Sequence, residues 1–396
     1  MLNKILKLIF CLFIFSSPAY SVVDESLDEV KKPKLKHYQG EILADEIIKL
    51  DDTIDGDTVE GVDFFDDDKL DFKLFTEYTF AKKKAIKFKE GPVDEFSGEL
   101  RFKGINSFEN IGDSMTSTYP FDINAVIESK FFENKFRFFT EYAFTRDVSD
   151  LDSEFFGKFS NLYIESNFSK NHKMRIGTSR APIGLEGSMS SFALPLINRA
   201  QISRNFGDAI ATGVSFLGNK NGFKYNLGGY TSTRFTQGFD DGAEFIGRIG
   251  YQPFYKSEGS YLKDLTIYTS ADVGHRKKDY QVYSAAINYE YKKLLMNFEY
   301  AYANGSNGDY FVQDKRQGFF TTVGWNFTPE VQLLLRYDCF DPNTSVSGDL
   351  NHEYTAGLNY FIFKQRLRFA VNYVFKDNKA TNSQSNAIYF LTQFFI

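Results

Sequence analysis

The chain of 396 residues has only two cysteines, four histidines and one tryptophan. Because Cys11 lies near the N-terminus, a chain processed after residue 21 keeps only Cys339 and has no intramolecular disulfide. No His/Cys cluster suggests a metal site, and no Gly-x-Ser-x-Gly or glycine-rich phosphate motif occurs. We therefore expect no enzymatic activity, no cofactor, no metal and no nucleic-acid partner.

Long hydrophobic runs are also missing. No internal segment reaches the roughly 18 apolar residues of a spanning helix, and no helix–strand alternation or linker divides the C-terminal three quarters. Yet the chain has 44 Phe and 24 Tyr at a mean hydropathy of −0.34. A soluble protein would need one large core for these rings, whereas a transmembrane β-barrel turns half of each strand toward lipid.

The N-terminus has the features of an export signal. Lys4 and Lys7 form a basic region, Leu8–Phe15 an apolar stretch of eight residues, and Ala19-Tyr20-Ser21 a small-x-small cleavage site. Eight apolar residues are too few for a membrane anchor. We predict a signal peptide at residues 1–21 and a location in the bacterial outer membrane.

Residues 22–68 are strongly acidic, with 16 Asp/Glu against 5 Lys. The segment has too few apolar residues to fold alone. Its acids lack the spacing of a calcium-binding loop, so a mobile periplasmic tail is the preferred interpretation and a calcium site the alternative.

Residues 93–396 show period-2 alternation broken by turn residues, which predicts an all-β, antiparallel barrel domain. In one example, Leu367, Phe369, Val371, Tyr373 and Phe375 alternate with a second, mainly polar face. Each such segment is about the 9–11 residues of a tilted membrane strand. The alternation continues to Ile396, preceded by Phe394 and Phe395, in keeping with a C-terminal strand that the barrel-assembly machinery recognises.

Connection lengths predict the topology. Short links such as 169–172 and 219–222 alternate with longer polar links, the asymmetry of periplasmic turns and outer loops. This predicts about sixteen strands, the first rising near Phe96. The segment 69–92 is left at the periplasmic rim, but Leu70–Phe80 also alternates, so eighteen strands remain an alternative.

The third outer link, Arg180–Asp208, is the longest at 29 residues. A loop of this length is usually functional or disordered. Its apolar residues argue against a solvated tip, so we expect it to fold into the lumen and narrow the pore.

Assigning the aromatic face of each strand to lipid turns a set of basic side chains toward the lumen. Candidate pore residues that bind anions are Arg101, Arg137, Arg175, Arg199, Arg204, Arg276 and Lys277. Lys103, Arg248, Arg336 and Arg368 also point inward, against acids such as Glu141, Glu165 and Asp338. Rings of Arg and Lys favour anions; the alternative is a ladder of salt bridges without preference.

The run Arg175–Glu186, with Pro182, Gly184 and Glu186 at its end, resembles a strand and turn of the phosphate-selective porins O and P. Asn198-Arg199, Phe245–Phe254 and Gly357–Tyr360 fit further family patterns in the same order. The resemblance implies sixteen strands, a homotrimer, a third-loop constriction turned at Pro182, Gly184 and Glu186, and a pore arginine at 199. Gly187 stands where a phosphate-preferring member has lysine, and Phe121-Asp122 where it has paired arginines.

The sequence thus predicts an outer-membrane porin in contact with lipid, through which small hydrophilic solutes diffuse passively, with a preference for anions such as phosphate. The alternative is a structural outer-membrane protein that tethers the envelope through its N-terminal segment. Conductance in planar bilayers separates the two.

Overall fold

The computed structural model describes residues 85–88, 91–111, 114–118, 120–147, 156–207, 209–232, 242–257, 259–307, 311–362 and 366–396. All of these belong to one compact unit, residues 59–396. The expected signal peptide (1–21), the acidic segment (22–68) and Leu70–Phe80 lie outside the described residues. No helix among the described residues is long and apolar enough to cross a membrane.

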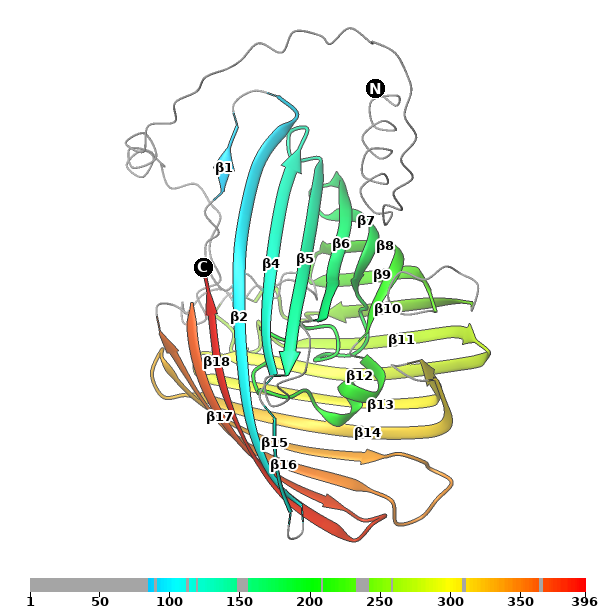
Figure 1. The fold of residues 1–396 in the computed structure, drawn as a ribbon. Helices are drawn as coiled ribbons and strands as arrows, with labels where there is room; N and C mark the ends of the chain where they lie inside the picture. The colour runs from blue at the N-terminus through cyan, green and yellow to red at the C-terminus, as the bar shows by residue number, and fades with distance from the viewer. Residues whose placement is uncertain are drawn as a thin grey trace, which may run out of the picture. The chain divides into compact units, whose positions relative to one another are not determined.

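Antiparallel strands make up almost all of the described chain (Figure 1). The long strands are β2 (Val93–Ile111), β4 (Pro120–Phe131), β5 (Phe136–Asp147), β6 (Phe156–Ser169), β7 (His172–Arg180), β8 (Ile210–Lys220), β9 (Phe223–Thr231), β10 (Ala243–Tyr251), β11 (Thr266–Arg276), β12 (Lys278–Tyr291), β13 (Leu294–Asn307), β14 (Phe311–Asn326), β15 (Val331–Asp341), β16 (Asn351–Ile362), β17 (Leu367–Asn378) and β18 (Ser383–Phe395). Two short strands, β1 (Ile86–Lys87) and β3 (Ser114–Thr118), pair only with β2.

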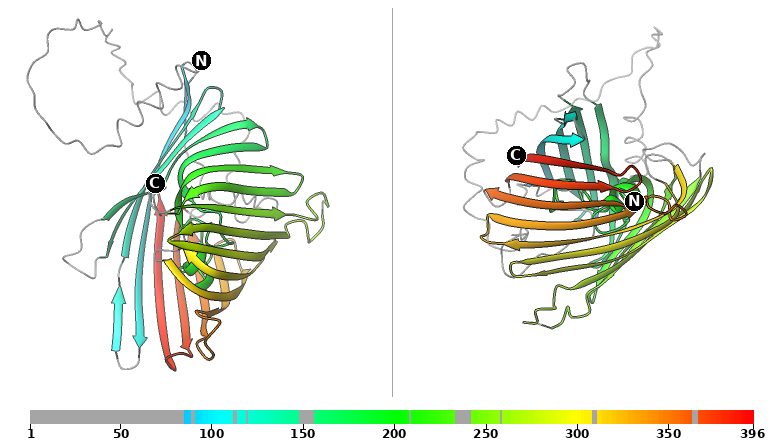
Figure 2. Two further views of the ribbon diagram at one scale, coloured as in Figure 1. Left: turned by 90° about the vertical axis from the view of Figure 1, so that its right-hand side faces the viewer. Right: turned by 90° about the horizontal axis from the view of Figure 1, so that it is seen from below.

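Each long strand pairs with its neighbour in sequence, and β18 pairs with β2 to close the ring. The last rung is reciprocal, since the backbone amides of Leu100 and Ile396 each donate to the other's carbonyl at 3.0 and 2.9 Å. A closed sheet has no edge with unpaired backbone groups, as a membrane requires. The prediction of a sixteen-strand antiparallel barrel is confirmed, and Figure 2 shows the ring from two further sides.

Side chains alternate across the wall as the sequence pattern predicts. On β17, Phe369 and Val371 are each 40% exposed, whereas the alternating residues Arg368 and Ala370 are each 3% exposed. The same period gives a belt of exposed apolar side chains around the whole barrel, including Ile127, Phe216, Tyr283, Trp325 and Leu358. This belt defines the outer face, and the opposite face of every strand is the inner face.

The two ends of the barrel differ. Short turns such as 170–171, 221–222 and 292–293 lie at one end, here the short-turn end, and longer links lie at the long-loop end. Two polar stretches of the kind expected as outer links are mostly strand instead: β2 and β3 cover 106–111 and 114–118, and β13 and β14 cover 304–307 and 311–316. Their polar residues still alternate and pair across the ladder, so polarity alone did not end these strands. The β11–β12 link is Lys277 alone, with a φ of 64°.

Candidate functional site

The third link at the long-loop end joins β7 to β8 (residues 181–209) and is here called loop 3. Its side chains are mostly buried, including Pro182, Leu185, Phe192, Leu196 and Ile202. They pack against apolar side chains on the inner face, for example Leu185 with Tyr268, and Ile202 with Phe320. A short π-helical turn, η2 (Ser203–Gly207), leads back to the wall.

Three inner-face arginines donate hydrogen bonds to backbone carbonyls of loop 3. Arg248 on β10 reaches the Gly184 carbonyl, and Arg336 on β15 reaches that of Asn198 at 2.9 Å. Arg368 on β17 donates to the carbonyls of Leu194 and Pro195, both at 2.8 Å. A guanidinium suits this task because its planar fork can serve several acceptors at once.

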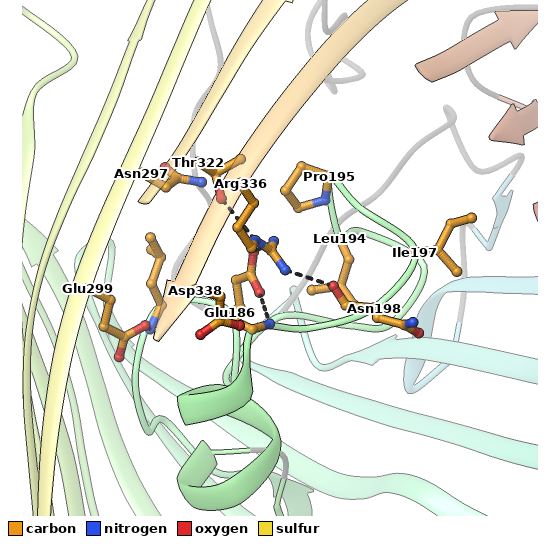
Figure 3. A network of polar contacts seen from close by, with 12 residues as sticks. Glu186, Leu194, Pro195, Ile197, Asn198, Asn297, Glu299, Thr322, Arg336 and Asp338 are labelled. Carbon is orange, nitrogen blue, oxygen red and sulfur yellow. Dashed lines mark hydrogen bonds and ion pairs between the residues drawn. The ribbon is translucent and has the colours of Figure 1, made fainter. Parts of the chain in front are cut away.

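Carboxylates supply the complementary half of the anchorage. The amides of Leu185, Ala200 and Gln201 donate to Glu299 (2.9 Å), Glu186 (2.8 Å) and Asp338 (2.6 Å) respectively. Glu186 also forms an ion pair with Arg336, buried on both sides. Figure 3 shows Arg336 between Thr322, Glu186 and Asn198, and draws Glu299 and Asp338 in the same view. Amides that loop geometry leaves without backbone partners are thereby satisfied.

Further contacts join loop 3 to β18 and β2. The Gln393 side-chain amide donates to the Phe192 carbonyl at 3.2 Å, and Lys103 donates to the Ser191 hydroxyl at 3.1 Å. Between Glu186 and Arg199 the loop contains no charged residue. The loop therefore contributes hydroxyls and backbone groups, rather than acids, along this stretch.

The expected turn residues lie at the start of the loop. Pro182, Gly184 and Glu186 are all buried. Gly184 has a φ of +67°, which favours glycine, and a Cβ there would also press on the Glu299 carboxylate. Its amide donates to the Ser270 hydroxyl at 3.0 Å.

Arg137 and Arg175 meet on β5–β7 near the short-turn end. Both pair with Glu165, at 2.6 and 3.3 Å, and both lie over the Tyr163 ring, Arg175 at 4.1 Å from its centroid. Glu128 is a second partner of Arg137 at 2.8 Å. The two predicted cations thus belong to one charge-alternating cluster.

The other predicted pore residues are spread over the inner face and its rim. Arg101 pairs with Glu99 (2.6 Å) and Glu141 (3.5 Å) and lies 5.9 Å from the ring centroid of Phe192 in loop 3. Arg199 donates within loop 3 to the Met189 carbonyl at 2.5 Å, and Arg204 pairs with Glu353 at 2.7 Å.

Arg276 and Lys277 lie at the tip of the β11–β12 hairpin. Arg276 donates to Asn307 at 2.9 Å, and Lys277 is exposed. The structure therefore brings Arg101, Arg199 and Arg204 to loop 3, puts Arg137 and Arg175 in a separate cluster, and leaves these two residues at the rim.

The residues that sequence reasoning missed as a group are the loop anchors Arg248, Arg336 and Arg368 with their acids. Alternation alone put these arginines on the inner face, but it gave no sign that their partners would be loop carbonyls. Among the described residues, no group of three or more His, Cys, Asp or Glu is arranged to hold a metal ion.

Residues 262–388 match the family model described as phosphate-selective porin O and P, which confirms the resemblance. No curated protein matches the chain. Among solved structures, Salmonella typhi OmpF in complex with daunomycin has a TM-score of 0.58 at 11% identity, covering 78% of this chain and 100% of that one. The outer membrane channel DcaP of Acinetobacter baumannii has a TM-score of 0.57 at 11% identity, covering 78% and 99%. These likenesses show the barrel fold.

Proposed function

We propose that this chain, an outer-membrane porin by its family match and its fold, is a water-filled pore for passive diffusion of small hydrophilic solutes. One observation supports this most: the inner face of a closed, apolar-belted barrel is lined with ionisable and amide side chains. Such a face would be costly in a sealed interior unless water or polar groups met it. Loop 3 is the constriction.

Recording from planar bilayers tests the pore. Purified, heat-modifiable mature protein is expected to give stepwise channel openings of porin size. Folded protein that stays silent would refute the pore and favour a purely structural role in the envelope.

The pore prefers anions, phosphate among them, but only moderately. In two ion pairs at the long-loop end the cation is the more exposed partner: the Arg204 side chain is 38% exposed against 15% for Glu353, and Lys376 28% against 22% for Glu109. On β2–β4 the order is reversed, with Asp122 more exposed than Lys103. Opposing contributions of this kind give a weak preference rather than strict selection.

The double substitution Arg175→Ala and Arg199→Ala tests the preference. Both guanidinium groups are buried, where charge acts at a lower effective dielectric than in water. Their removal should lower the anion-to-cation permeability ratio, read as a shifted reversal potential in a salt gradient. Lys277→Ala, an exposed rim charge, should shift it less because salt screens it. An unchanged reversal potential in the double variant would exclude these two arginines as selectivity residues.

The same proposal includes a signal peptide at residues 1–21 and an acidic periplasmic segment at 22–68. The barrel-assembly machinery inserts the barrel into outer-membrane lipid, where it forms homotrimers. Deleting residues 22–68, with the signal peptide kept, should leave a barrel that inserts and conducts. A truncated chain that fails to insert would make the acidic segment part of the barrel's assembly.

A further inference from the structure

A pocket opens on the inner face toward the long-loop end, between the second half of loop 3 and strands β15–β18. It is here called the outer pocket. Its lining residues are Leu196, Asn198, Arg199, Arg204, Arg336, Glu353, Thr355, Asn372, Val374, Lys376 and Tyr389.

Cations dominate the charged part of this lining. Arg199, Arg204, Arg336 and Lys376 line the pocket together with one carboxylate, Glu353; Arg336 and Lys376 also pair with Glu186 and Glu109 outside the lining. Arg204 meets Glu353 through one terminal nitrogen, and a guanidinium has five N–H groups to offer. Its side chain is also more than one third exposed, so the guanidinium can receive a carboxylate from solution.

Asn372 is an independent sign of a ligand. Its side chain is 2% exposed, and its Oδ1 accepts the Ile197 amide at 3.4 Å. The Nδ2 group has no hydrogen-bond partner among the described residues. A buried donor without an acceptor costs free energy, and an oxygen atom of a ligand in the outer pocket would remove that cost.

The rest of the lining suits an organic molecule with hydroxyl groups. Asn198, Thr355 and Tyr389 combine donors and acceptors, as a hydroxyl group requires, while Leu196 and Val374 present apolar surface. An inorganic anion such as phosphate has no carbon surface to pack against the two apolar side chains. A polyhydroxy carboxylate matches all three kinds of lining group.

We propose that the outer pocket is a binding site for small hydroxycarboxylates, whose carboxylate pairs with Arg204 and Lys376 and whose hydroxyls contact Asn372 and its neighbours. The proposal rests on the porin function above and names a solute class for the pore.

Single-channel recording with gluconate as the probe tests the site. Gluconate added on the long-loop side should interrupt the open current in a concentration-dependent manner. Acetate, which has the carboxylate alone, and sorbitol, which has the hydroxyls alone, should each interrupt it far less. Phosphate that interrupts as effectively as gluconate would overturn the hydroxycarboxylate assignment and make the pocket a general oxyanion site.

Substitutions locate the effect. Arg204→Gln should weaken the apparent gluconate affinity by about tenfold or more, because a charge-assisted hydrogen bond is lost. Asn372→Asp keeps the acceptor for Ile197 but removes the donor, and should also weaken gluconate. Lys376→Gln should act in the same direction as Arg204→Gln.

Lys130 provides a matched control. It pairs with Glu95 at 2.6 Å and is 31% exposed, close to the 2.7 Å and 28% of Lys376 with Glu109, but it lies at the short-turn end. Lys130→Gln should leave gluconate affinity unchanged. Open channels that gluconate never interrupts, or equal effects of the Lys130 and Lys376 variants, would overturn the pocket alone. Bilayers without openings would instead overturn the porin function.

Discussion

The ion pair between Arg336 and Glu186 is buried, with side-chain exposures of 3% and 0%. Arg336 also donates to the Asn198 carbonyl and the Thr322 hydroxyl, and Glu186 accepts the Ala200 amide. Arg336 therefore binds loop 3 at Glu186 and at Asn198, and Glu186 links the start of the loop to Ala200. Burial of both charges costs desolvation free energy, which offsets much of their attraction. Removing one partner leaves the other charge buried and uncompensated, so the loss of stability is then large.

Arg336→Met is expected to destabilise the closed form of loop 3 by about 3–5 kcal/mol, since Glu186 would be left as an uncompensated buried charge. Limited proteolysis of the folded barrel should then cut within 187–198. Adding Glu186→Gln should restore part of the resistance, because the orphaned charge is gone. Equal protease sensitivity of the single and double variants would mean that the pair does not hold the loop.

The sequence predicts on which face of the barrel wall these residues lie, but it does not predict which residues they contact. Alternation puts Arg336 and Arg368 on the inner face from their neighbours alone, since a side chain's face depends only on parity along its strand. The partner of Arg336 lies 150 residues away and that of Arg368 174 residues away. Such pairings depend on where loop 3 runs, which no local pattern records.

Loop 3 crosses the inner face as one element. Its polar contacts reach β10, β11, β13, β15–β18 and β2. Gly187 permits the close approach of its two ends, because a Cβ there would meet Gly207. The length and apolar content of the loop predicted a packed segment, and both features are local enough to be read from the sequence.

Replacing residues 187–196 by a short Gly-Ser linker is expected to raise single-channel conductance. This stretch crosses the inner face from β2 to β17 and β18, so its removal should widen the passage. The barrel should still form, because its ladder does not pass through the loop. Conductance equal to that of the parent, in protein with an unchanged heat-modifiable band, would show that loop 3 does not limit the current.

The apolar belt is a property of the whole barrel rather than of any strand. Trp325, the single tryptophan of the chain, is 46% exposed on the outer face, one residue before the short-turn end of β14. Tryptophan is favoured where a membrane meets water, because its ring is apolar and its N–H is polar. Its position makes it a natural reporter of depth.

Trp325 fluorescence in reconstituted vesicles should be quenched by lipids brominated near the headgroup more than by lipids brominated near the chain end. Acrylamide in the aqueous phase should quench it weakly in the folded protein. After unfolding in urea, acrylamide should quench it strongly and the brominated lipids weakly. Strong acrylamide quenching in the folded state would contradict a lipid-facing position for this strand end.

Sixteen strands could be counted from the sequence because one period and one alternation of link lengths extend over the barrel. The ends of β2, β3, β13 and β14 could not be predicted from the sequence, because polar residues still pair in the ladder when a neighbouring strand is present. Strand existence depends on local pattern, whereas strand ends depend on the neighbour.

The anchorage of loop 3 also has a consequence for assembly order. Apart from Arg180 at the end of β7, its polar partners lie on strands that follow it in the chain, β10 to β18, and on β2, which can meet β18 only at closure. Contacts over such sequence separations form slowly, because ordering the intervening chain comes first. Loop 3 is therefore expected to stay accessible to protease on partly assembled barrels and to become protected as the last seam closes, so its protection would time that step.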